Sequence, residues 1–89
     1  MNNRLPLVKF YTKEECPLCE TALGIIMQVA ETNDFELKIL DISQDDSLLM
    51  RFGTEIPVVE INGDIAFKYR VNKKKFIRLL KSSSLHPFS

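Results

Sequence analysis

Two cysteines separated by two residues constrain this chain more than any other feature. Cys16 and Cys19 are its only cysteines, and they stand where a strand-like apolar run gives way to a helix-like one. Residues three apart on a helix lie on the same face, so the two sulfur atoms can meet across one helical turn. The sequence therefore predicts a strand that leads into a helix, with a cysteine pair at the junction that can open and close as a redox device.

The elements on either side of this pair have clear patterns. Residues 5–11 are rich in Leu, Val, Phe and Tyr, which predicts a nearly fully buried strand. Pro17 occupies a first helical position, where its fixed φ favours the helix and its missing N–H is not needed. The predicted helix ends at Asn33-Asp34 and carries a broad apolar face formed by Leu18, Ala22, Ile25, Ile26, Val29 and Ala30.

A second strand is predicted over residues 35–42, where apolar and polar side chains alternate. Asp41 lies near the end of this strand. It is either a buried proton carrier for Cys19 or a partly solvated carboxylate at the end of the strand. The apolar positions that face one way are Phe35, Leu37 and Ile39.

A short helix is expected after this strand. Ser43 is predicted to cap it, with Asp46 three residues further on in the place of the usual Glu or Gln, and Gly53 is predicted to stop it. Met27 and Met50 are expected to fill gaps in the core. The apolar stripe of the short helix consists of Leu48, Leu49 and Phe52.

The last part of the chain predicts a hairpin and a helix. Residues 57–61 and 65–69 form two strands joined by Asn62-Gly63, a strong turn because both residues tolerate positive φ. Asn72 can cap the final helix, whose inward side chains are Phe76, Leu79 and Leu80.

The predicted element order is β-α-β-α-β-β-α. Its first half has the crossover pattern of parallel strands, and its second half adds an antiparallel hairpin. The fold class is therefore α/β, with a mixed four-stranded sheet and three helices that cover both faces. We expect a single domain over residues 1–81 and a polar tail over residues 82–89, with the site beyond the carboxyl end of the first strand.

Composition excludes several classes of protein. The chain has 89 residues, 45% of them apolar, which is enough for one modest core. Its 12 basic and 12 acidic side chains balance, whereas a nucleic-acid-binding surface would show a basic excess. No apolar run approaches the roughly 20 residues that span a bilayer, and Pro6 and Lys9 interrupt any secretory signal. We expect no nucleic-acid or membrane partner, and a cytoplasmic protein in which a close cysteine pair is catalytic or metal-binding.

Zinc binding and ordinary core packing are the alternatives to redox chemistry for the pair. A structural zinc site needs four ligands, and only His86 could join the two sulfurs from the usual set of N and S ligands, so we predict no metal site. In disulfide exchange the thiolate attacks. Cys16, just before Pro17, should lie at a helix N-cap, where free N–H groups and the helix dipole favour an anion. Cys19, one turn deeper, would then resolve the mixed disulfide.

Four features of the sequence, taken together, are typical of one protein family: Lys13, the Cys16-Pro17-Leu18-Cys19 site, Glu55-Ile56-Pro57 and the Asn62-Gly63 turn. Over roughly residues 5–80 they resemble the glutaredoxins, most closely the small bacterial glutaredoxin-like proteins. The resemblance implies a thioredoxin-like fold, a cis bond at Pro57 that lies against Cys16, and an exposed Ile56 backbone that pairs with an extended substrate. It also implies that Lys13 can meet a glutathione carboxylate and that Pro17 and Leu18 border the substrate.

The sequence departs from the glutaredoxin pattern at three places. Leu18 stands where an aromatic residue is usual, and Glu55-Ile56 stands where Thr-Val is usual. The Gly-Gly whose amides help to hold glutathione should fall near Phe67 and Lys68, whose side chains would crowd that approach. The sequence therefore predicts a weakened or absent glutathione site.

The function expected from the sequence is a dithiol thiol–disulfide oxidoreductase, with Cys16 as nucleophile and Cys19 as resolving thiol. We expect a monomer with no cofactor, a protein or small disulfide as substrate, glutathione as a possible co-substrate and a reductant of unknown identity. One alternative is a non-catalytic module that docks a protein partner at the Ile56-Pro57 groove. Another is an iron–sulfur carrier, in which two subunits share a cluster through Cys16 with glutathione as co-ligand.

Overall fold

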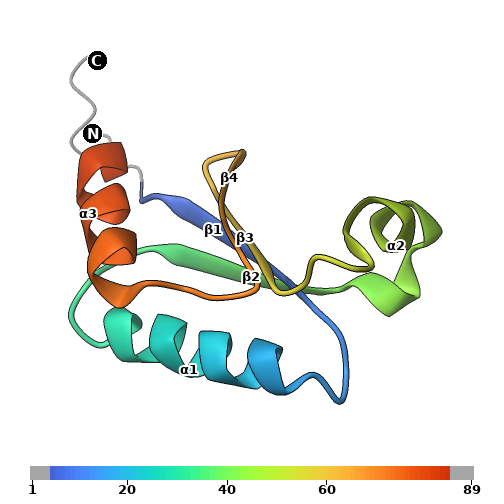
Figure 1. The fold of residues 1–89 in the computed structure, drawn as a ribbon. Helices are drawn as coiled ribbons and strands as arrows, with labels where there is room; N and C mark the ends of the chain where they lie inside the picture. Colours follow the sequence, from blue (N-terminus) through green and yellow to red (C-terminus); the bar gives the residue numbers. More distant parts are fainter. Residues whose placement is uncertain (1–4, 85–89) are drawn as a thin grey trace.

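The computed structural model describes residues 5–84 and confirms the predicted order of strands and helices (Figure 1). One short 3-10 turn, η1, is added between the second strand and the second helix. The elements are β1 (Leu7–Thr12), α1 (Pro17–Ala30), β2 (Glu36–Asp41), η1 (Ile42–Gln44), α2 (Asp46–Phe52), β3 (Val58–Ile61), β4 (Asp64–Lys68) and α3 (Lys73–Ser84).

The four strands form one mixed sheet in the order β2-β1-β3-β4. Strand β1 pairs in parallel with β2 and antiparallel with β3, and β3 and β4 form the antiparallel hairpin. Because β1 is an interior strand, its carboxyl end opens at the middle of the sheet. The loop that leaves Thr12 therefore delivers Cys16 to a central position, as expected for a ligand site in an α/β sheet.

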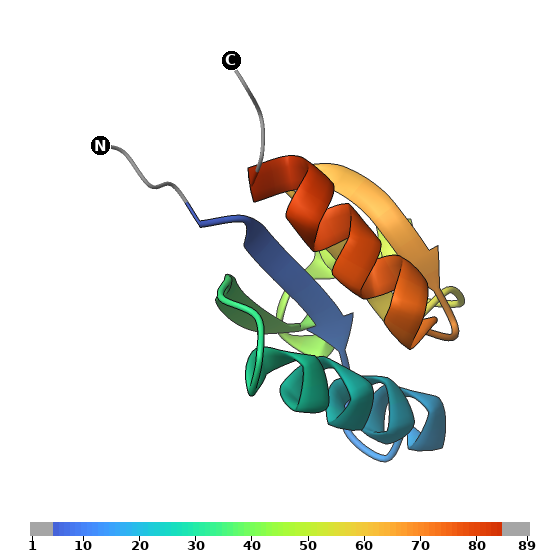
Figure 2. The ribbon, with the colours of Figure 1, turned by 90° about the vertical axis from the view of Figure 1, so that its left-hand side faces the viewer.

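Helices cover both faces of the sheet, as the sequence predicted. Helices α1 and α3 pack on one face, where β1 contributes Val8 and Phe10 to the main core (Figure 2). Helix α2 packs on the other face, where Phe52 meets the Tyr11 ring at a centroid distance of 4.6 Å. The remaining buried members of the main core are Cys19, Ala22, Ile26, Val29, Val59, Ile61, Phe67, Val71, Phe76 and Leu80.

The cap predicted for α2 is wrong. Ser43 lies in η1, where its N–H donates to Asp41 Oδ1 at 2.9 Å. Asp45 caps α2 instead, and its carboxylate accepts from Ser47 N–H at 2.9 Å and Leu48 N–H at 3.3 Å. The η1 turn moves the start of α2 toward the C-terminus. Asp45, whose carboxylate accepts from the N–H two residues later in the chain, therefore supplies the cap. These hydrogen bonds, first of all from the hydroxyl groups of Ser43 and Ser47, lower the pKa of Asp41 and Asp45.

The structure also decides the role of Asp41. Its carboxylate is bonded to Ser43 at the end of β2 and is not buried, so it is the partly solvated group and not a buried proton carrier for Cys19. Helix α2 ends at Gly53 as predicted.

The predicted turn and the last cap are confirmed. Asn62 and Gly63 take φ values of 51° and 91°, the pattern of a two-residue hairpin turn. Lys75 N–H donates to Asn72 Oδ1 at 2.9 Å at the start of α3. The helix then continues to Ser84, into the segment that we expected to be tail. His86 and the other residues after 84 lie outside the described part of the chain, as do residues 1–4.

Several apolar side chains are more exposed than their patterns predicted, among them Leu5 at 46% and Leu49 at 36%. Ile39 is 52% exposed because β2 is an edge strand, and nothing on its outer side pairs with it in residues 5–84. Met27 and Met50 are 50% and 88% exposed, so neither fills the core. In each case the apolar pattern of the helix or strand extends beyond the part of its surface that other helices or strands cover.

Candidate functional site

The first residue of the site is Cys16, which caps helix α1 as the sequence predicted. It has extended backbone angles (φ −123°, ψ 100°), and Pro17 follows in the first helical position. The N–H of Cys19 donates to Cys16 Sγ at 3.2 Å, and Glu20 N–H donates to the Cys16 carbonyl at 3.1 Å. The Cys16 sulfur therefore accepts the hydrogen bond that a Ser or Asp oxygen accepts at most helix starts.

Cys19 lies behind Cys16, in the core. Its side chain is 3% exposed, whereas Cys16 is half-buried, and both are free thiols in this structure. Burial is the main cause that raises the pKa of Cys19, and a hydrogen bond with the Cys16 sulfur raises it further. The Thr12 hydroxyl and the Lys13 backbone act in the opposite direction. The pair is thus asymmetric, with one accessible sulfur and one enclosed thiol that holds its proton.

The reduced protein is expected to lose stability as the pH rises above the ordinary thiol pKa of about 8.5. The folded chain holds the Cys19 proton more tightly than the unfolded chain. This contribution to stability is complete below the ordinary thiol pKa of about 8.5 and is lost as the pH rises through the folded value. Urea unfolding at increasing pH should show the decline, and Cys19→Ala should show a smaller one. Tyr11, whose pKa is also raised, is present in both the wild type and Cys19→Ala, so it contributes equally to the two curves. Equal losses of stability in the two proteins would contradict the expectation.

The loop between β1 and α1 carries exposed charges. Lys13, Glu14 and Glu15 are all exposed, and Lys13 forms no ion pair within residues 5–84. Glu15 has a φ of 57°, which is uncommon for a residue with a side chain. This conformation turns the chain from the strand direction into the helix start immediately before Cys16.

The segment before β3 carries Ile56 and Pro57, the other two residues that the sequence assigns to the substrate. The Ile56-Pro57 bond is cis, as the resemblance implied. Ile56 is half-buried and packs against both core clusters, and Cys16 packs against one of them. Within residues 5–84 neither the N–H nor the C=O of Ile56 is hydrogen-bonded. Two contacts tie this segment to β4 and the residue after it: Tyr69 N–H donates to the Pro57 carbonyl at 2.8 Å, and Lys68 Nζ lies 3.0 Å from Glu55 Oε1.

Phe67 and Lys68, near which the resemblance places the Gly-Gly, both lie in β4. Phe67 is in the core, and Lys68 pairs with Glu55. The segment that leads into α3 begins with Tyr69 and Arg70. Tyr69 has a φ of 71°, and Arg70 N–H donates to the Lys68 carbonyl at 2.7 Å, which defines a tight and strained γ-turn.

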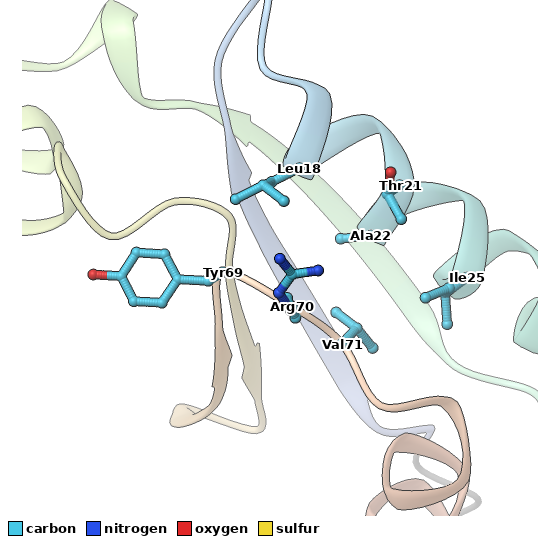
Figure 3. Close-up of a pocket in the computed structure, with 7 residues that line it drawn as sticks. All are labelled: Leu18, Thr21, Ala22, Ile25, Tyr69, Arg70 and Val71. Carbon is cyan, nitrogen blue, oxygen red and sulfur yellow. The ribbon is translucent and has the colours of Figure 1, made fainter.

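A groove of about 140 Å³ runs between this segment and α1 (Figure 3). Sequence reasoning identified Leu18 at its edge but missed the residues of the opposite wall, because no local motif marks them. Only the tertiary fold brings the two walls together. The groove is lined by Leu18, Thr21, Ala22, Ile25, Tyr69, Arg70 and Val71.

Residues 5–84 contain no group of three or more His, Cys, Asp or Glu side chains that could hold a metal ion. No helix in this part of the chain is long and apolar enough to cross a membrane.

The chain is similar to known proteins in both sequence and fold. Residues 7–81 match the family described as "Glutaredoxin-like domain (DUF836)". The chain is 31% identical over 74 residues to the "Glutaredoxin-like protein YDR286C homolog" of Dictyostelium discoideum, which covers 76% of this chain and 68% of that protein.

Solved structures share the fold at low sequence identity. Protein Ne2328 from Nitrosomonas europaea aligns with a TM-score of 0.75 and 21% identity, over 90% of this chain and 99% of that one. A thioredoxin variant from Halobacterium salinarum aligns with a TM-score of 0.69 and 14% identity, over 91% and 76% of the two chains. These alignments show a thioredoxin-like fold.

Proposed function

Because this chain belongs to the glutaredoxin-like family, we propose that it is a thiol–disulfide oxidoreductase that uses Cys16 and Cys19. The observation that carries the proposal is the asymmetry of the pair. Cys16 is partly accessible at a helix N-cap and receives the Cys19 N–H on its sulfur, while Cys19 is enclosed one turn behind it. An attacking thiol needs access and groups that stabilise the sulfur anion, and a resolving thiol needs only to reach its neighbour.

The first step is attack on a substrate disulfide. The Cys16 thiolate bonds to one substrate sulfur, the substrate S–S bond breaks, and the other substrate sulfur leaves as a thiolate that takes a proton from water. The N–H groups at the start of α1 and the helix dipole favour the attacking anion. The product is a mixed disulfide between Cys16 and the substrate.

The second step resolves this mixed disulfide. Cys19 loses its proton and attacks Cys16 Sγ, and the second substrate sulfur leaves and is protonated. The substrate has then gained two electrons and two protons, and the protein holds a Cys16–Cys19 disulfide. The raised pKa keeps Cys19 protonated until this step, and the Thr12 hydroxyl and the Lys13 backbone lie where they can stabilise the sulfur as it ionises. An external thiol returns the pair to the reduced state.

The substrate would lie beside Cys16 and along the Ile56-Pro57 segment. We propose that the free N–H and C=O of Ile56 pair with an extended substrate segment and that Pro57 fixes the direction of this backbone. Exposed Lys13, Pro17 and Leu18 would border the disulfide. The partner is a protein or small-molecule disulfide, the protein acts as a monomer without a bound cofactor, and a reducing compartment such as the cytoplasm would allow the pair to cycle.

The test is the exchange reaction of the purified protein. Incubation of the reduced protein with excess hydroxyethyl disulfide should form the Cys16–Cys19 disulfide. The mass of the protein then falls by two hydrogens, and two free thiols are consumed. Equilibration with a glutathione couple and with a thioredoxin couple would then show which one exchanges electrons with the pair. A pair that neither closes with any disulfide nor opens with any thiol would overturn the proposal.

The free backbone of Ile56 also favours a second candidate, a binding module that docks an extended partner without turnover. Retained binding of a partner peptide in a protein that shows no exchange with any donor would favour this candidate over the first.

A further inference from the structure

The groove between α1 and residues 69–71 is physically connected to the cysteine site. Leu18, on one wall, stands between the two cysteines in the chain and is 36% exposed. Tyr69, on the other wall, donates its N–H to the carbonyl of Pro57. Figure 3 shows the side chains of Leu18, Ala22 and Ile25 directed from α1 toward the opposite wall. A group in this groove would therefore lie beside a disulfide that reacts with Cys16.

The size of the groove limits what it can hold. Its volume of about 140 Å³ is well below the roughly 300–1,000 Å³ of pockets that hold whole small molecules. A cavity of about 150 Å³ accepts a benzene-sized group. The groove thus has room for one aliphatic or aromatic side chain, and apolar side chains form most of its lining. Glutathione (γ-glutamyl-cysteinyl-glycine) has no apolar side chain to place there.

Arg70 adds a charge to this apolar surface. Its guanidinium lies between the two walls, while the ring of Tyr69 points away from the groove (Figure 3). The strained turn at Tyr69 sets the direction of both side chains. Arg70 forms no ion pair within residues 5–84. A guanidinium is well suited to bind a carboxylate through two parallel hydrogen bonds.

We propose that this groove is a side-chain subsite that selects polypeptide disulfides, and this rests on the proposed function. An apolar side chain near the reactive cysteine of the substrate enters the groove, and an Asp or Glu beside that apolar residue meets Arg70. From Leu18 to Ile25 the helix advances about 10 Å. An extended chain covers this length in about three residues. The selected apolar residue is therefore two or three positions from the substrate cysteine.

A second groove gives an internal comparison. It has a similar volume, about 150 Å³, and is lined by Ile61, Asp64, Ile65, Ala66 and Leu79. The strand register places it at the far end of the sheet, since Val8 pairs with Ile61 whereas Tyr11, at the cysteine end, pairs with Val58. Its lining includes the acidic Asp64, whereas the first groove has the basic Arg70. Apolar character alone would not distinguish the two grooves, but closeness to Cys16 and the charge of Arg70 do.

The experiment uses four peptides of eight residues, each with one cysteine held as a mixed disulfide with 2-mercaptoethanol. Two positions vary. One holds Leu or Ser and lies three residues from the cysteine, and the other holds Glu or Gln and lies beside that Leu or Ser. Second-order rate constants with the reduced protein should be roughly tenfold higher for Leu than for Ser. They should be roughly two- to fivefold higher for Glu than for Gln. In Arg70→Gln the ratio between Glu and Gln peptides should fall to about one, while Arg78→Gln, which removes an exposed charge from α3, should retain it.

The outcomes separate the subsite from the proposed function. Reduction of hydroxyethyl disulfide together with equal rates for all four peptides would overturn the subsite and leave the oxidoreductase standing. Failure to reduce any disulfide would overturn the oxidoreductase. The subsite then still has a direct test, in which the Leu/Glu peptide with an S-methylated cysteine should shift the methyl NMR signals of Leu18, Ile25 and Val71. Shifts only at Ile61 and Ile65, or none, would overturn it.

Discussion

Replacement of Cys16 by serine is expected to abolish disulfide exchange, lowering its rate by at least about a thousandfold. Cys19→Ser is expected to do something different: the first step should proceed, and the reaction should stop at a stable mixed disulfide. The reason is the asymmetry of the pair, since only Cys16 is accessible and Cys19 is enclosed in the core. A serine hydroxyl resembles the thiol in shape and is slightly smaller, but it supplies no thiolate, so it cannot attack a disulfide at neutral pH.

Mass spectrometry of the whole protein measures both results. After incubation with a peptide disulfide, Cys19→Ser should carry one peptide, Cys16→Ser should carry none, and the wild type should lose two hydrogens. The double variant Cys16→Ser/Cys19→Ser controls for non-covalent retention of the peptide. A peptide attached to Cys19 in Cys16→Ser would show that the enclosed thiol can attack, and the assigned roles would then be wrong.

Replacement of Phe76 by alanine is expected to lower the free energy of unfolding by about 3–5 kcal/mol. The ring is fully buried and makes edge-to-face contacts with Phe35 and Phe67, at centroid distances of 5.6 and 6.2 Å. These contacts join α3 to β4 and to the residue just before β2. Since a domain of this size has a total stability of about 5–15 kcal/mol, one substitution would remove a large part of it.

Urea unfolding followed by circular dichroism measures the effect. Met50→Ala is the matched control, because this long apolar side chain is 88% exposed and its loss should change stability by less than about 0.5 kcal/mol. If Phe76→Ala costs no more than Met50→Ala, then α3 does not contribute to the core as the structure shows. Phe76→Leu, which keeps most of the apolar volume, should lie between the two.

The features that the sequence predicted correctly depend on neighbouring residues. Pro17 marks a helix start through its own φ, and Asn62-Gly63 form a turn because both accept positive φ. Asn72 caps α3 through a bond to an N–H three residues away. The cap of α2 was missed for a related reason: Ser43 and Asp45 are both suitable cap residues, and the inserted η1 turn selected Asp45.

The features that the sequence did not predict depend on the tertiary fold. Ile39 fits an inward-facing pattern, yet it is exposed because its strand lies at the edge of the sheet. The cysteine pair can be recognised from the sequence because its two members are only three positions apart. Arg70 and Val71, which face Leu18 across the groove, are about fifty residues away from it and carry no motif of their own. Only the packing of the 69–71 segment opposite α1 makes them part of a site.

Tyr69 N–H donates to the carbonyl of Pro57. This bond joins the Ile56 backbone, which would align a bound strand, to the 69–71 segment that carries Arg70, so the two form one preorganised frame. Neither half needs to be ordered by an arriving molecule, so little conformational entropy is left to lose on association. Selectivity at such a frame would come from the fit of the incoming chain and not from closure of the protein around it.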